Sequence, residues 1–162
     1  NDPLLMLFDP VDVTWFIFII IYGSLIAGLL LVISDPVKLL FAFQSYTVLV
    51  LFRMAAMYIV ALEPPVTMIP LADPFAEYFT TGSIMTKDLF FSGHTATLFF
   101  LFLITEKKIP RYLFLCASFA IAILVLLQHV HYTIDVFAAP FFTYGAYKLV
   151  LLIRSKFNLN YM

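Results

Sequence analysis

Long apolar runs separated by short polar segments dominate this chain. Five of the runs approach the roughly 20 residues that a helix needs to cross a bilayer. They lie at about residues 12–33, 36–62, 89–105, 112–130 and 135–153. The one long connection, residues 63–88, is rich in proline, threonine and acidic residues. The pattern predicts an all-α, polytopic membrane bundle with five spans.

The composition points to the same class of protein. Of 162 residues, 64% are hydrophobic and only 12% are charged, and the mean hydropathy is +1.04. A soluble domain is nearer half apolar and a quarter charged, so we expect an integral membrane protein with a single domain over residues 1–162. A net charge of −1 without a basic cluster gives no reason to expect a nucleic-acid partner. The single cysteine, Cys116, excludes an intrachain disulfide.

Lysine and arginine are distributed unevenly among the predicted loops. If the loops alternate sides, one side receives most of these residues: Lys38, Lys107, Lys108, Arg111, Lys148, Arg154 and Lys156. Arg53 and Lys87 are the exceptions. The positive-inside rule makes the lysine-rich side cytoplasmic. The long connection and the three histidines then belong to the non-cytoplasmic side, in a bacterial inner membrane or in a Golgi or plasma membrane.

Two short segments place ionisable side chains at the mouths of apolar runs. Ser92-Gly93-His94-Thr95 opens the third run, and the segment from His129 to Asp135 separates the last two runs. An ionisable group in hydrocarbon costs several kcal/mol, so such residues are functional candidates by default. The i, i+4 spacing puts His131 and Asp135 on one helical face. A carboxylate in that position can fix the tautomer of an imidazole and stabilise its charged form.

Two chemistries suit two histidines and an aspartate at a membrane surface. A metal site is one, but zinc usually takes three or four protein ligands, and the sequence offers no third donor with ligand-like spacing. Phosphoryl transfer through a phosphohistidine fits better. His131, oriented by Asp135, would attack phosphorus, and His94 would protonate the departing oxygen. Ser92 and Gly93, at a helix start, would bind the phosphate, and no metal or other cofactor is expected.

Together the two histidine segments resemble the sphingomyelin synthase-related branch of the type 2 phosphatidic acid phosphatase superfamily. Residues 88–95, Asp-Leu-Phe-Phe-Ser-Gly-His-Thr, are similar to that branch's Gly-Asp-x-x-Phe-Ser-Gly-His-Thr segment. Residues 129–136, His-Val-His-Tyr-Thr-Ile-Asp-Val, are similar to its His-x-His-Tyr-x-x-Asp-Val segment. A weaker match surrounds Arg53. The resemblance covers roughly residues 50–145.

The resemblance implies a six-helix membrane fold with an outward-facing site, the first helix lying before Asn1. It implies transfer of a phospho-headgroup from a glycerophospholipid to a ceramide-like acceptor, with release of diacylglycerol. His131 would be the nucleophile, Asp135 its partner, His94 the general acid and base, and Asp88 a nearby carboxylate. A further carboxylate of the long connection is expected to complete the site, the candidates being Glu63, Asp73 and Glu77.

The classical phosphatases of the superfamily carry two cationic elements that this chain lacks. One is a Lys-x6-Arg-Pro segment, and the other is a Ser-Arg pair before the second histidine, where this chain has Val125 and Leu126. A phosphodiester carries less charge than a phosphate monoester, so the missing cations favour a phosphodiester lipid as substrate. Arg53 lies inside an apolar run. A structural arginine there would pair with a buried carboxylate or extend its side chain to the membrane surface, and a functional one would meet the lipid phosphate from below.

Other interpretations remain open at this stage. A lipid phosphatase or phospholipase C-like hydrolase would use the same site with water as acceptor, and a non-catalytic membrane protein would retain it without use. Asp88 would also suit an N-cap, and His129 suits packing or contact with a lipid headgroup. The sequence does not decide whether the protein forms a homo-oligomer.

Overall fold

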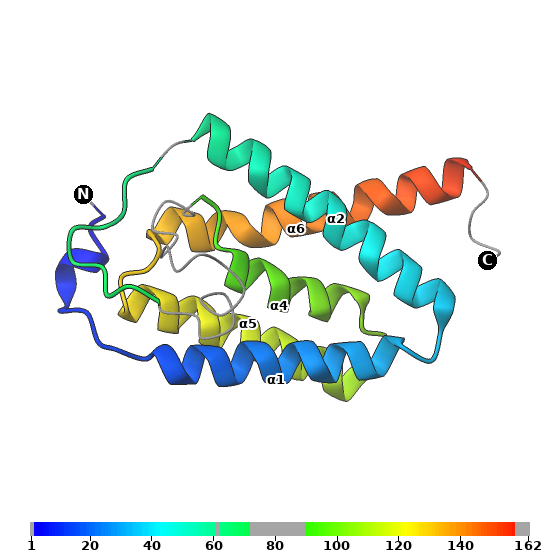
Figure 1. Ribbon diagram of the computed structural model, residues 1–162, viewed down its shortest axis with the longest axis horizontal. Coiled ribbons are helices and arrows are strands. Elements are labelled where there is room, and N and C mark those ends of the chain that lie inside the picture. The colour runs from blue at the N-terminus through cyan, green and yellow to red at the C-terminus, as the bar shows by residue number, and fades with distance from the viewer. Residues whose placement is uncertain (1, 61, 72–89, 158–162) are drawn as a thin grey trace, which may run out of the picture.

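The computed structural model describes residues 2–60, 62–71 and 90–157, and these form a bundle of helices (Figure 1). A short 3-10 helix, η1, spans Leu5–Leu7. The main elements are α1 (Thr14–Val32), α2 (Pro36–Ile59), α4 (Gly93–Ile104), α5 (Lys108–Leu127) and α6 (Thr133–Lys156). The described residues contain no strand, which confirms the predicted all-α fold.

Four of these helices, α1, α2, α5 and α6, are long and apolar enough to cross a membrane. The third predicted span gives α4, a shorter apolar helix of 12 residues. Large apolar side chains such as Trp15, Phe119 and Phe141 are exposed on the outside of the bundle. In water such a surface would promote aggregation, whereas in a bilayer it contacts lipid. The chain is therefore an integral membrane protein.

The helix ends differ from the sequence prediction by up to four residues, and three of these differences have a clear local reason. α5 begins at Lys108 rather than near residue 112, because Pro110 falls in the first turn, where proline is tolerated. It ends at Leu127 rather than 130, because His129 adopts a left-handed backbone with φ 55°. α6 continues to Lys156, so Arg154 is part of the helix.

Arg154 is thus buried rather than exposed in a tail. Its side chain is 5% accessible. Its Nη1 donates to Gln44 Oε1 at 2.9 Å, and its guanidinium lies over the ring of Phe41, 5.6 Å from the centroid. These contacts with α2 explain why α6 extends past the predicted end.

α4 lies at the centre of the bundle, between α2 and α6 on one side and α1 and α5 on the other (Figure 1). One core cluster joins Leu98 and Leu101 of α4 to α1 and α5. A second joins Ala96 and Phe100 of α4 to α2 and α6. The short α4 is therefore surrounded by the longer helices, and residues at its N-terminus are positioned from both sides.

The two ends of the bundle have different chemistry. At one end Lys38 Nζ lies 2.7 Å from Glu106 Oε2 and joins the first turn of α2 to the turn after α4. Asp35 caps α2 by accepting from the Val37 and Lys38 amides. The opposite end holds residues 62–71, the start of α4 and the link from α5 to α6 (Figure 1). Both histidine segments lie at this second end, as the loop pattern predicted.

Candidate active site

His131 and Asp135 lie together at the N-terminus of α6. The distance from His131 Nδ1 to Asp135 Oδ2 is 3.6 Å, and the two side chains are buried. This is beyond hydrogen-bond distance, but contacts in unliganded catalytic sites are often longer than in the reacting complex. Asp135 Oδ2 also accepts from the Tyr132 amide at 3.0 Å and so caps the helix. With Nδ1 towards the carboxylate, Nε2 is the nitrogen left for bond formation.

His94, in the first turn of α4, lies opposite His131. The two ring centroids are 6.2 Å apart, and the ring planes meet at 66°. A backbone bond holds the segments together, since the Ser92 amide donates to the Asp135 carbonyl at 3.1 Å. The structure therefore brings together the three residues to which the sequence analysis gave chemical roles.

The turn that precedes α4 is buried and closely bonded. Ser92 is fully buried, and its Oγ accepts from the Thr95 amide at 3.4 Å and from the Thr95 hydroxyl at 3.2 Å. Ser118 of α5 donates to the Thr95 carbonyl at 3.3 Å. The hydroxyl of Ser92 thus caps the helix, and its predicted contact with phosphate stays a prediction. A helix N-terminus carries partial positive charge that stabilises anions, and here it lies beside His94.

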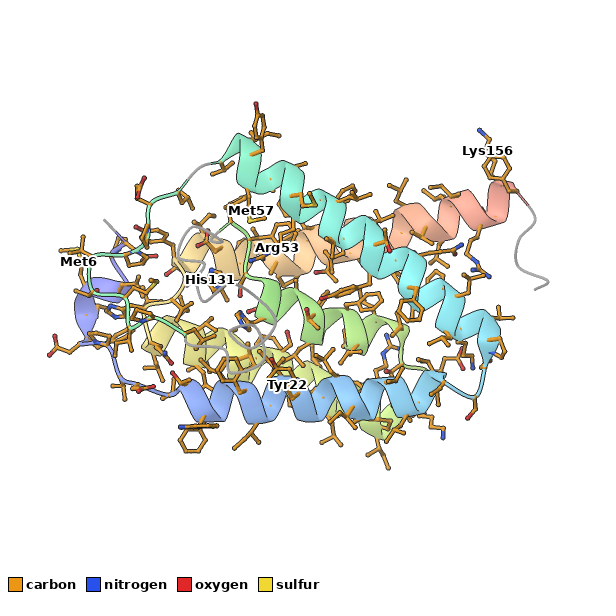
Figure 2. All side chains as sticks on the ribbon, in the orientation of Figure 1. Met6, Tyr22, Arg53, Met57, His131 and Lys156 are labelled. Carbon is orange, nitrogen blue, oxygen red and sulfur yellow. The ribbon has the colours of Figure 1, made fainter. Side chains whose placement is uncertain are left out.

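Arg53 reaches this turn from α2. Its Nη1 donates to the Phe91 carbonyl, and its guanidinium lies 5.8 Å from the centroid of the Phe91 ring. A Cβ added at Gly93 would come within 2.9 Å of Arg53 Cζ, so glycine permits the close approach. Figure 2 shows Arg53 and His131 in the same part of the bundle. The charge of Arg53 is therefore held against the backbone that carries His94.

Two cavities flank Tyr132, the residue after His131. The larger has a volume of about 760 Å³ and a mostly apolar wall that includes Leu62, Ile134 and Phe137. The smaller, of about 370 Å³, is lined by Tyr132 and His129 together with parts of residues 2–10 and 65–67. A cavity that combines apolar walls with a few polar groups suits an amphiphilic ligand.

Glu63, one of the predicted loop carboxylates, is exposed and lines the larger cavity. Its backbone carbonyl accepts from the Tyr132 hydroxyl at 3.0 Å. Glu63 is thus next to the site, while the other carboxylate candidates, Asp73, Glu77 and Asp88, lie outside the described residues. Within the described residues, no group of three or more His, Cys, Asp and Glu side chains could hold a metal ion.

His129 packs inside the protein and does not face the membrane surface. Its side chain is 2% exposed. Its Nδ1 lies 2.6 Å from the Thr67 hydroxyl oxygen, and its ring meets that of Phe8 edge-on at 5.2 Å. Of the two interpretations of this residue, the structure favours packing. Histidine is one of the residues that tolerate the left-handed backbone found here.

Two residues of this end were missed by the sequence analysis. Gln128 is fully buried, and its side chain accepts from the Val13 amide at 3.2 Å while donating to the Thr14 hydroxyl at 2.8 Å and the Ile69 carbonyl at 3.3 Å. It ties α5 to the start of α1 and to the segment after α2. A glutamine near the end of an apolar run was the available signal.

Asp2 is the second missed residue. Its Oδ2 accepts from the Thr133 amide at 2.6 Å, and its Oδ1 accepts from the Thr133 hydroxyl at 3.0 Å. Burial raises the pKa of the Asp2 carboxyl, but the hydrogen bonds from Thr133 and from the backbone of residues 4 and 5 outweigh it and hold the pKa below its usual 3.8. No local sequence signal links Asp2 to α6, because the partners lie at opposite ends of the chain.

Part of the chain matches a known protein family. Residues 86–151 match a family model described as PAP2 superfamily C-terminal. The matched stretch contains α4, α5 and most of α6, with both histidine segments. No curated protein and no solved structure matches significantly. Over this stretch the chain is therefore similar to the C-terminal part of the PAP2 superfamily, whose members are phosphatases and phosphotransferases.

Proposed function

We propose that this chain is a lipid phosphotransferase of the sphingomyelin synthase-related branch, acting through a phosphohistidine. It would move a phospho-headgroup from a glycerophospholipid to a ceramide-like acceptor. The observation that carries the proposal is the arrangement of three side chains. His94 and His131 face each other with ring centroids 6.2 Å apart, and Asp135 lies 3.6 Å behind the Nδ1 of His131.

In the first step, His131 Nε2 attacks the phosphorus of the donor lipid. An N–P bond forms while the P–O bond to the glycerol breaks, and His94 gives a proton to that oxygen, so diacylglycerol leaves neutral. Asp135 stabilises the positive charge that develops on the His131 ring. The headgroup phosphate stays on His131, beside the positive end of α4.

In the second step, the acceptor lipid occupies the place that diacylglycerol left. Its hydroxyl oxygen attacks phosphorus, His94 takes the hydroxyl proton, and the N–P bond breaks to restore neutral His131. Two lipids then never need to bind at once, and the kinetics should be ping-pong. If water takes the place of the acceptor, the same residues perform a hydrolysis.

Two features support a lipid phosphodiester as substrate. The larger cavity adjoins Tyr132 and has an apolar wall that suits hydrocarbon or glycerol ester groups. The cation that contacts the turn before His94, in the described part of the chain, is Arg53. A single guanidinium matches the single charge of a phosphodiester better than the nearly double charge of a monoester.

The proposed site faces away from the cytoplasm. The opposite end of the bundle carries Lys38, Lys107 and Lys108, and the positive-inside rule favours that end as the cytoplasmic one. Cysteine labelling with a membrane-impermeant reagent tests this orientation. A cysteine introduced at the exposed Val66 should react in intact cells, whereas one at the exposed Glu106 should not, both in a Cys116→Ser background.

A headgroup-transfer assay tests the function. The purified protein is incubated with phosphatidylethanolamine, phosphatidylcholine or phosphatidylinositol, with and without ceramide, and products are identified by mass spectrometry. Ceramide-dependent formation of a phosphoceramide is expected, with His131→Ala as the inactive control. Diacylglycerol release at the same rate without ceramide would make the protein a hydrolase. If the protein turns over none of these lipids, it is a non-catalytic membrane protein and the proposal is wrong.

A further inference from the structure

Two carboxylates from opposite ends of the chain share the N-terminus of α6. Asp135 accepts the Tyr132 amide at 3.0 Å. Asp2 accepts both donors of Thr133, the amide at 2.6 Å and the hydroxyl at 3.0 Å. A helix leaves its first N–H groups without intrahelical partners, and carboxylates are favoured acceptors for them. The donors of this turn are thus divided between Asp2 and Asp135.

Because Asp2 accepts the donors of Thr133, the Asp135 carboxylate can lie beside His131. The oxygen that takes the Tyr132 amide, Oδ2, is also the one 3.6 Å from His131 Nδ1. Thr133 lies in the same turn, between the two residues of this pair. If Asp2 were absent, the amide and hydroxyl of Thr133 would compete for the remaining carboxylate and draw it away from Nδ1.

We infer that Asp2 is a positioning residue for the proposed reaction. It accepts the hydrogen bonds of the Thr133 amide and hydroxyl, and so keeps the Asp135 carboxylate beside His131 Nδ1. The inference rests on the proposed function. The Asp2 side chain is itself fixed, since its Oδ1 also accepts from the Leu4 amide at 3.0 Å. The carboxylate therefore acts on catalysis through Thr133 and Asp135, without touching the reacting atoms.

The first test separates positioning from simple helix capping. Asp2→Ala is compared with Asp12→Ala. The second variant removes an aspartate cap of the same kind, in which the Thr14 amide donates to Asp12 Oδ1 at 3.0 Å. Both variants lose one cap, but only Asp2 adjoins the histidine pair. Asp2→Ala should lower kcat about tenfold or more with KM unchanged, since small misplacements of catalytic groups are costly. Asp12→Ala should keep the kcat of the parent protein.

A second variant keeps the test informative if Asp2→Ala folds poorly. Asp2→Asn retains one acceptor oxygen and should lose less activity. Adding Thr133→Val to Asp2→Ala removes one of the two competing donors and should restore part of the lost kcat. An active parent protein whose Asp2 variants keep full kcat per folded molecule would overturn the inference, even if they melt at lower temperature.

A spectroscopic test does not depend on turnover. With ¹⁵N-labelled histidine, the imidazole shifts of His131 report which ring nitrogen carries the proton when the ring is neutral. The parent protein should show a proton on Nδ1, and Asp2→Ala should show a mixture of both tautomers. An unchanged tautomer in Asp2→Ala would overturn the role of Asp2. A parent protein that turns over no lipid would instead defeat the proposed function, so the two failures are distinguishable.

Discussion

Ser92 and Asp135 are joined through their backbones, the Ser92 amide donating to the Asp135 carbonyl at 3.1 Å. Ser92 caps α4, and Asp135 lies in the first turn of α6. The bond therefore fixes the starts of two helices against each other and keeps His94 facing His131. Because it uses only backbone atoms, substitutions at these two positions keep both bonding groups unless proline replaces Ser92.

Asp135→Asn should separate the two contacts of this carboxylate. The amide oxygen of asparagine can still accept from the Tyr132 amide, so the cap and the fold should persist. The negative charge near His131 Nδ1 is lost, and kcat should fall about 100-fold or more. Steady-state kinetics and circular dichroism measure the two effects. Asp12→Asn removes a charge at the start of α1 and should be fully active. Full activity of Asp135→Asn would show that its charge does not assist His131.

Gly93→Ala should damage the site more than the fold. The new methyl group would come 2.9 Å from Arg53 Cζ and Nη1, so the guanidinium must move and release the Phe91 carbonyl. Because a flexible side chain can yield, the thermal midpoint should change little while activity falls. Gly23→Ala is the matched control, since nothing lies within 4 Å of its added carbon.

A double-mutant cycle tests the cause of that loss. If the alanine methyl acts by displacing Arg53, then Gly93→Ala should cost much less activity in an Arg53→Ala background than in the parent protein. Additive losses in the two variants would contradict this explanation and point to another role for Gly93.

Gln128→Leu should destabilise the end of the bundle that carries the site. The change leaves the Val13 amide, the Thr14 hydroxyl and the Ile69 carbonyl without their partner. Unsatisfied polar groups of this kind should lower the free energy of unfolding by about 2–3 kcal/mol, measured by denaturant unfolding in detergent. Ser45→Ala is the contrast, because its buried hydroxyl has no hydrogen-bond partner among the described residues. That variant should be neutral or more stable.

Stability should fall in acid through three aspartate caps. Hydrogen bonds hold the pKa of Asp2 below 3.8 despite its burial. Bonds from the backbone amides of Thr14 and Lys38 do the same for the pKa of Asp12 and of Asp35. A carboxyl whose pKa is lower in the folded state stabilises the fold fully above its unfolded pKa, and this contribution is lost as the pH falls through the folded value. The thermal midpoint should therefore be flat near neutrality and decline below about pH 4.

The control for this pH dependence removes all three carboxylates at once. A protein with Asn at positions 2, 12 and 35 should show a lower midpoint at neutral pH and a shallower decline in acid. An acid decline as steep as that of the parent protein would mean that other groups cause it.

The sequence predicted the helices well because apolar length is a strong signal, and it predicted their ends less well. α6 passes through Pro140 without ending, and it includes Arg154 because Gln44 and Phe41 on α2 receive that side chain. α5 stops early because His129 turns the backbone left-handed. Such endings depend on partners that no local window of sequence contains.

Some contacts of the candidate site were likewise predictable from the sequence, and others were not. The proximity of His94, His131 and Asp135 followed from helical spacing and from the alternation of loops across the membrane. The contacts of Asp2 and Gln128 could not be predicted, since each joins residues more than 50 positions apart. Arg53 was recognisable as unusual inside an apolar run, but its contact with Phe91 required the packing of α2 near α4.

The contact between Asp2 and Thr133 spans 131 positions of sequence, which has a consequence for biosynthesis. A chain that emerges from the ribosome in order presents Asp2 before α6. The Asp2 carboxylate cannot reach Thr133 until α6 has been made, so this contact forms after α1, α2, α4 and α5 have left the ribosome. The surroundings of the histidine pair are therefore completed by a segment that must wait, already synthesised, for its partner.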